Sequence, residues 1–130
     1  MDKSAMKDII TLTFKQVRSL FIWQCDRVTF GVPEDWRSHA DQVERGEVFF
    51  DDCDGFALTC AELLTRRGIP REFIRLAFCR TETGEGHLVC IANELTLDNR
   101  QRHTWHWTHL PYEWISSMRM DEIGTWRQSG

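Results

Sequence analysis

The first third of the chain carries apolar residues at roughly helical spacing. From Met6 to Trp23 they line one face of an amphipathic helix that packs on a core. Gly31-Val32-Pro33 breaks this pattern, Glu34-Asp35-Trp36 begins a second, short helix, and Gly46 closes it. The pattern therefore predicts two helices before the middle of the chain.

A third helix is predicted from Cys53 to Arg67. Its apolar residues are dense enough for a buried helix, and the apolar run Val48-Phe49-Phe50 leads into it. Gly68 and Pro70 stop the helix, since glycine favours the turn that ends a helix and proline cannot continue one.

After the third helix the pattern changes from a period of about 3.6 to short extended runs. Strands are predicted over residues 73–79, 87–92 and 95–98, the first two as a hairpin, with one or two more in an aromatic tail that ends near Trp126. Because the helices come first and the strands second, the predicted class is α+β: N-terminal helices packed on a C-terminal antiparallel β-sheet, in a single domain over residues 1–130.

Composition limits the classes of binding partner and the cellular compartments that fit this chain. The net charge of −4, with 16 basic and 20 acidic residues, argues against nucleic acid or an anionic membrane as the main partner. Five cysteines without a C-x-x-C pair argue against a disulfide framework or a cysteine-rich zinc module, and favour reduced thiols. The charged N-terminus lacks the unbroken apolar core of a signal peptide or membrane span, so a cytoplasmic location is expected. Composition leaves the oligomeric state open.

Cys53 stands where the third helix begins. The helix dipole and the free backbone N–H groups at a helix N-terminus favour a thiolate there. Asp51, Asp52 and Asp54 flank it, and their charges raise the pKa of the thiol by repulsion. An N-cap role for Asp52 would turn one of these carboxylates toward the helix's own N–H groups.

His87 and Asp98 complete a set of residues that can perform acyl transfer. His87 begins a predicted strand after a glycine-rich turn, and Asp98 ends the next strand, so the two can be cross-strand neighbours. An aspartate there would hold the imidazole in the tautomer that presents a free nitrogen to the thiol of Cys53. A cysteine in an apolar helix is most often core packing, as we expect for Cys60, but residue type, order and location here agree on a catalytic site.

Three segments stand in a recognisable order: Asp52-Cys53-Asp54-Gly55-Phe56-Ala57, Gly86-His87-Leu88-Val89 and Leu97-Asp98-Asn99. They resemble the three motifs of the bacterial transglutaminase-like cysteine proteinases. Glu34-Asp35-Trp36 is similar to that family's Asp-x-Trp approach, and the likeness covers roughly residues 30–126.

This resemblance implies a papain-like fold of the transglutaminase type and a role for each site residue. Cys53 is expected to be the nucleophile, His87 the general base and then acid, and Asp98 the orienting carboxylate. The backbone N–H of Cys53 would supply one oxyanion donor. Trp36, through its indole N–H, is the candidate for the second donor, and simple packing over the site is the alternative role of that side chain.

Some members of that family bind calcium through carboxylates next to the cysteine. Asp52 and Asp54 match two of those positions, but Gly55 stands where the family usually has a third acid. Calcium sites use six to eight oxygen ligands, more than this segment supplies. We therefore expect no required cofactor, with calcium binding possible through Asp52 and Asp54.

The tail contains His103, His106 and His109 among tryptophans. On a strand the first and last of these would share one face and His106 the other, which makes a poor three-histidine zinc site. A tryptophan-lined groove beside the active site, holding a peptide or glycan, is a second interpretation of this tail.

Together these patterns predict a cysteine hydrolase that cleaves a peptide or other amide bond through a thioester, with a protein or peptide as substrate. Three alternatives remain: transglutaminase-like acyl transfer, a catalytically idle binding or assembly module on the same fold, and a metal-binding protein that uses the histidine tail. A compact chain without an export signal would also suit a bacteriophage or mobile element.

Overall fold

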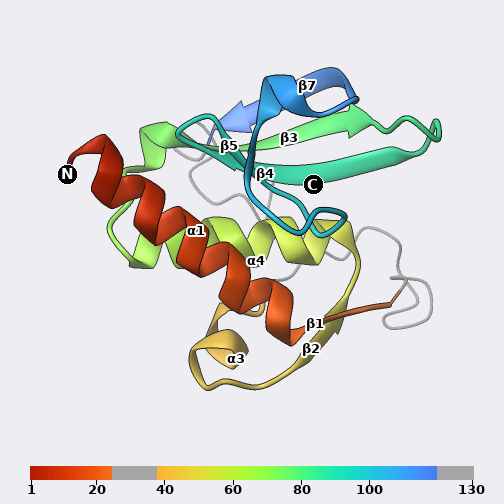
Figure 1. Ribbon diagram of the computed structural model, residues 1–130. Coiled ribbons are helices and arrows are strands. Elements are labelled where there is room, and N and C mark those ends of the chain that lie inside the picture. Colours follow the sequence, from red (N-terminus) through yellow and green to blue (C-terminus); the bar gives the residue numbers. More distant parts are fainter. Residues whose placement is uncertain (25–37, 120–130) are drawn as a thin grey trace.

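The helix α4 (Cys53–Arg66) lies at the centre of the fold. The computed structural model describes residues 1–24 and 38–119 of the chain. Most of α4 is buried, including Leu58, Leu63 and Leu64. A helix that is apolar nearly all round needs cover on several sides. The long helix α1 (Lys3–Leu20) covers one side of α4, and the sheet covers another (Figure 1).

The helix α1 buries one stripe of side chains against α4. Met6, Ile10, Phe14 and Val17 are buried, at the spacing that the sequence predicts, and the Phe14 ring meets the Phe56 ring edge-on. The helix begins after the N-cap Asp2, whose carboxylate accepts a hydrogen bond from the Ala5 amide at 2.7 Å.

The prediction that this helix continues to Trp23 is wrong. Phe21–Trp23 forms a strand, β1, parallel to β2 (Phe49–Asp51), with Trp23 opposite Asp51. Tertiary packing accounts for the change, because the Phe21 ring in this strand packs on the rings of Phe49 and Phe56, with centroids 5.6 and 5.0 Å away. The pairing brings Trp23 close to the start of α4.

The predicted second helix is present in part. Helix α3 (Ala40–Glu44) ends before Gly46, as the sequence indicates. The predicted start of this helix at Glu34-Asp35-Trp36 lies outside the described residues.

The second half of the chain forms an antiparallel sheet of five strands in the order β6-β5-β4-β3-β7. Its strands are β3 (Ile74–Arg80), β4 (Gly86–Ala92), β5 (Leu95–Leu97), β6 (Trp105–His106) and β7 (Glu113–Arg119). The predicted β3–β4 hairpin is confirmed. One face carries Leu76, Leu88 and Cys90 toward α4 and joins the main core. The predicted architecture, helices packed on a C-terminal antiparallel sheet, is therefore the observed one.

The histidine tail does not form a continuous strand. The strand β6 ends at His106, and Trp107–His109 turns as a short 3-10 helix, η2; a second such turn, η1 (Arg71–Phe73), precedes β3. The alternating arrangement of the tail that a strand would give is therefore wrong. Within residues 1–24 and 38–119, no group of three or more His, Cys, Asp or Glu side chains is arranged to hold a metal ion.

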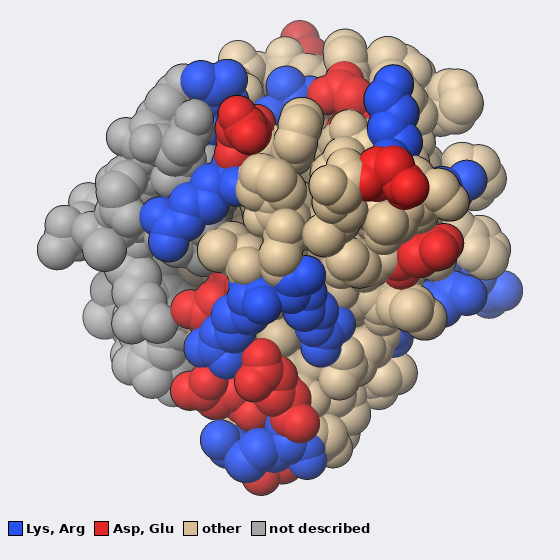
Figure 2. All heavy atoms as spheres, turned by 90° about the vertical axis from the view of Figure 1, so that its left-hand side faces the viewer, with Lys and Arg blue, Asp and Glu red and all other residues tan. Residues whose placement is uncertain are grey.

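Charged side chains of both signs mix on the surface. Figure 2 shows basic and acidic residues close together on the face it presents, rather than in separate patches. Arg66, for example, contacts Asp41, Glu44 and Glu62. Among the described helices, none has the length and apolar character needed to cross a membrane.

Candidate active site

Cys53 is the first residue of α4, as the sequence predicts. Asp52 is the N-cap, and its Oδ1 accepts hydrogen bonds from the amides of Asp54 at 3.0 Å and Gly55 at 3.4 Å. This contact confirms the capping role expected for Asp52. Among the described residues the Cys53 amide has no hydrogen-bond partner, so its N–H is open for an incoming oxygen.

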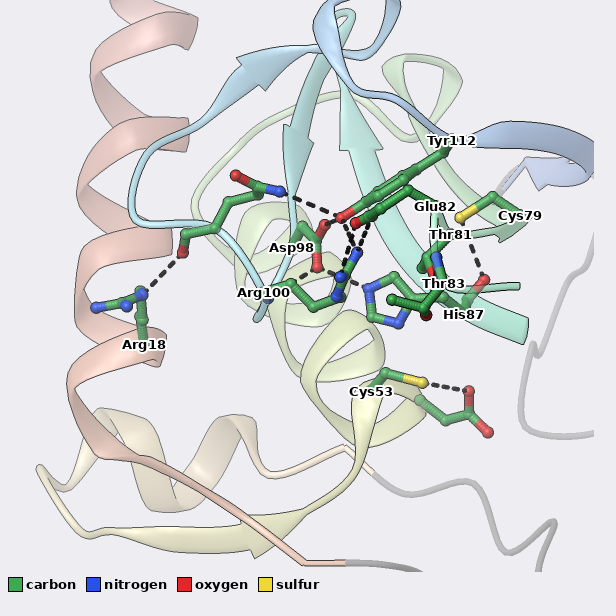
Figure 3. A network of polar contacts seen from close by, with 12 residues as sticks. Arg18, Cys53, Cys79, Thr81, Glu82, Thr83, His87, Asp98, Arg100 and Tyr112 are labelled. Carbon is green, nitrogen blue, oxygen red and sulfur yellow. Dashed lines mark hydrogen bonds and ion pairs between the residues drawn. The ribbon is translucent and has the colours of Figure 1, made fainter. Parts of the chain in front are cut away.

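His87 and Asp98 meet as the hairpin argument predicts. His87 is the second residue of β4, and Asp98 directly follows β5, which pairs with β4. Nε2 of His87 lies 2.7 Å from Oδ1 of Asp98, and both side chains are buried. In Figure 3 the imidazole lies between Asp98 and Cys53. Because Nε2 is engaged by the carboxylate, Nδ1 is the ring nitrogen left for the thiol.

Asp98 has further partners that sequence reasoning did not assign. The Tyr112 hydroxyl donates to Oδ2 at 2.5 Å, and the Arg100 amide donates to Oδ1 at 2.9 Å. Burial alone would raise the pKa of Asp98, but the interactions with His87 and Tyr112 outweigh burial and hold this pKa below its usual value. The pKa of Tyr112 rises to about 12, through burial first and then through its hydrogen bond to Asp98. Tyr112 therefore helps to keep Asp98 charged and fixed in place.

The surroundings of the Cys53 thiol disfavour its thiolate form. Its Sγ lies 3.6 Å from Oδ1 of Asp54 and next to the backbone amide of Leu88, the residue after His87. Burial raises the pKa of this thiol well above its usual value, and the charge of Asp54 raises it further. Burial and the charge of Asp52 in turn raise the pKa of Asp54 to about 6. The repulsion expected from the flanking aspartates is thus present, and Asp54 is its main source.

A cleft of about 230 Å³ opens beside Cys53 and His87. Its other lining residues are Trp23, Thr81, Glu85, Gly86, Asn99 and Arg100. Sequence reasoning missed Trp23 because it placed that residue in a helix. Trp36, the expected second oxyanion donor, lies outside the described residues, so its role stays a prediction.

The residues next to Cys53 do not fit a calcium ion. Oδ1 of Asp52 is engaged by α4, and Asp51 pairs with His39 at 2.7 Å. Gly55 brings no carboxylate, and a Cβ atom built there would lie 1.9 Å from Oδ2 of Asp51, so the position has no room for a side chain. Calcium requires six to eight oxygen ligands, and among the described residues next to Cys53 only the carboxylate of Asp54 neither caps α4 nor pairs with His39.

The expected tryptophan groove exists, but it is not next to the active site. Trp107 and Trp114 line a hollow of about 220 Å³ together with Arg75 and Ile91. They pack on Ala77 and Ile91, which alternate along the strands with the residues that face α4. The hollow therefore lies on the sheet face opposite α4 and Cys53.

Comparison with known proteins identifies a family for this chain. A model of the family described as bacterial transglutaminase-like cysteine proteinases matches residues 2–129. No curated protein matches the chain.

Solved structures of Legionella pneumophila LapG have the same fold. One aligns with a TM-score of 0.63 and 18% identity, covering 89% of this chain and 71% of LapG. The calcium-bound form aligns with a TM-score of 0.64 and 19% identity, covering 89% of this chain and 71% of LapG. The EGTA-treated form aligns with a TM-score of 0.62 and 18% identity, covering 88% of this chain and 68% of LapG. These identities show the fold alone. Because the family model spans almost the whole sequence, the chain belongs to the bacterial transglutaminase-like cysteine proteinase family.

Proposed function

We propose that this cysteine peptidase cleaves a peptide bond of a protein substrate with Cys53, His87 and Asp98 as its catalytic triad. One observation carries the proposal above the others. Asp98 holds Nε2 of His87 at 2.7 Å, and the imidazole lies between that carboxylate and the thiol at the start of α4 (Figure 3). Orientation of the base by a third group is the arrangement that activates a nucleophile in triads.

The first half of the reaction forms a thioester. Because burial raises the pKa of the Cys53 thiol, we propose that His87 removes the thiol proton through Nδ1 as the substrate arrives. Sγ then attacks the carbonyl carbon, and the oxyanion that forms accepts a hydrogen bond from the open Cys53 amide. His87 returns the proton to the leaving amine, the C–N bond breaks, and a thioester on Cys53 remains.

The second half releases the acid. His87 takes a proton from water, the resulting hydroxide attacks the thioester carbonyl, and the C–S bond breaks with return of the proton to Sγ. The negative charge of Asp98 stabilises the imidazolium in both halves, and the hydrogen bond from Tyr112 keeps that carboxylate in place.

We propose that the reaction needs no metal ion. Asp52 caps the helix, Asp51 pairs with His39, and Gly55 removes one possible ligand, which leaves Asp54 beside Cys53. Calcium-bound LapG shows that a protein of this fold can carry the ion, so calcium dependence has to be measured on this chain.

Alkylation of the folded protein by iodoacetamide, with the labelled site located by mass spectrometry, tests the triad. Cys53 is expected to label before the buried Cys60, Cys79 and Cys90, and His87→Ala is expected to slow its labelling. Cys53→Ala is expected to abolish cleavage of an unfolded protein substrate while the fold is retained. If His87→Ala leaves the labelling rate of Cys53 unchanged, the proposal is wrong. Incorporation of an added amine into the substrate would show acyl transfer instead of hydrolysis.

A further inference from the structure

A second histidine–aspartate pair, with His39 partly buried and Asp51 buried, lies beneath the first turn of α4. Nε2 of His39 lies 2.7 Å from Oδ2 of Asp51, with side-chain exposures of 13% and 2%. Neither residue lines the cleft beside Cys53. The pair is therefore separate from the proposed triad.

His39 is held from three elements. Its Nδ1 lies 2.5 Å from Oε1 of Gln42 on α3, its ring stacks on Phe49 of β2, and its backbone amide donates to Oγ1 of Thr59 on α4 at 2.9 Å. Both ring nitrogens thus meet oxygen acceptors. With Oε1 of Gln42 facing Nδ1, the protonated imidazolium is the form of His39 that donates to both oxygens, and this arrangement favours a positive charge beside Asp51.

Asp51 in turn contacts the first turn of α4. Its Oδ1 accepts a hydrogen bond from the Asp52 amide at 2.7 Å, one residue before Cys53. Its carboxylate also fills the space where a side chain of residue 55 would lie, since a Cβ built on Gly55 would come within 1.9 Å of Oδ2. Only glycine permits this close approach of a carboxylate to the helix backbone.

The charge balance shows what the pair contributes. Asp51, Asp52 and Asp54 all lie at the junction between β2 and α4, and Asp51 is 1% exposed. A buried carboxylate among like charges is costly unless a cation pairs with it. A metal ion could supply that positive charge. In this structure the group that contacts the Asp51 carboxylate is the imidazole of His39.

We propose that His39 and Asp51 are positioning residues, whose ion pair neutralises the buried end of β2 and fixes the first turn of α4 so that Cys53 is held in place without a metal ion. This inference rests on the proposed catalytic role of Cys53 and His87. It adds the reason why the site can work without calcium.

The first test uses the unaltered protein. The labelling rate of Cys53 by iodoacetamide and the melting temperature are measured with calcium chloride and with EGTA in excess. Both are expected to be the same in the two solutions. Nitrogen-15 NMR is expected to show both ring nitrogens of His39 protonated at neutral pH. Loss of labelling in EGTA with recovery in calcium, or a neutral His39 ring, would overturn the proposal.

The second test compares variants at a temperature where all are folded. His39→Ala is expected to slow the His87-dependent labelling of Cys53 by roughly tenfold to a hundredfold, as displaced catalytic groups commonly do. His39→Gln, which keeps one donor, should fall between His39→Ala and the wild type. Val43→Ala, a buried residue on the same helix α3, is the control that lowers stability and leaves labelling unchanged.

The outcomes separate this inference from the triad. If His87→Ala slows labelling but folded His39→Ala labels at the wild-type rate, the positioning role is wrong and the triad stands. If His87→Ala has no effect, the proposed function itself is wrong. Should His39→Ala fail to fold, His39→Gln and the calcium comparison on the unaltered protein still decide the question.

Discussion

Replacement of Asp54 by Asn should make Cys53 more reactive. Asp54 accepts the thiol's hydrogen bond at 3.6 Å, and after burial its charge is the largest cause of the raised pKa of Cys53. Asn has nearly the same shape but no charge. The variant therefore removes the repulsion of the thiolate and leaves the rest of the site in place.

The size of the effect follows from the separation. Two unit charges about 4 Å apart repel by about 1 kcal/mol in water and by about 4 kcal/mol at an effective dielectric constant of 20. At about 1.4 kcal/mol per pKa unit, loss of the Asp54 charge should lower the pKa of Cys53 by roughly one to three units. Each unit gives about ten times more thiolate, but a less basic thiolate is also a weaker nucleophile. The net gain in labelling rate is therefore expected to be roughly threefold to thirtyfold.

The assay is the pH dependence of iodoacetamide labelling at Cys53. For Asp54→Asn the rise of the rate with pH should begin at a lower pH than in the wild type. The matched control is Asp41→Asn, which removes the same charge. Asp41 pairs with Arg66, at the end of α4 opposite Cys53. An unchanged or upward-shifted profile for Asp54→Asn would refute the electrostatic argument, as would an equal shift in Asp41→Asn.

The same variant should alter how stability depends on pH. The pKa of Asp54 is about 6 in the folded protein and about 4 when unfolded, so between these values the folded chain holds a proton that the unfolded chain has lost. The contribution of Asp54 to stability is thus full below about pH 4 and falls, by up to about 3 kcal/mol, as the pH rises to about 6. Urea unfolding at both pH values should show this loss in the wild type and not in Asp54→Asn.

Three further variants test other parts of the site. Tyr112→Phe removes a hydrogen bond that lowers the pKa of Asp98 in the folded protein. Charged Asp98 stabilises the fold above the usual carboxyl pKa, and as the pH falls the variant should lose this stability at a higher pH than the wild type. Urea unfolding at a series of pH values measures the difference. Trp36→Phe should lower kcat by about a hundredfold or more if its indole N–H binds the oxyanion, whereas Trp23→Phe should change mainly KM, and the reverse pattern would exchange their roles. Cys60→Ala should cost about 1 kcal/mol of stability and leave Cys53 labelling unchanged, because Cys60 is fully buried.

The sequence was sufficient wherever the controlling interactions are local. The apolar spacing of α1 and α4, the glycine after α3 and the turn between β3 and β4 each specify an element from neighbouring residues. The same applies to the contact between His87 and Asp98, because a short antiparallel connection brings the ends of adjacent strands together. The class of the fold and the pairing of His87 with Asp98 follow from these local rules.

Only the tertiary structure decided the features that depend on residues distant in the sequence. Phe21–Trp23 leaves the helical pattern because it pairs with β2 and packs on Phe49. Trp107, in a 3-10 turn, and Trp114 pack on Ala77 and Ile91, so the hollow they line lies on the sheet face opposite α4.

The acidic block around Cys53 shows the same division most clearly. Its aspartates and the unusual Gly55 can be read in the sequence, but nothing in their spacing indicates that His39 is the partner of Asp51. The reason is physical: helix and turn preferences act over a few residues, whereas the burial of a charge selects its partner from whatever the folded chain brings within hydrogen-bond distance.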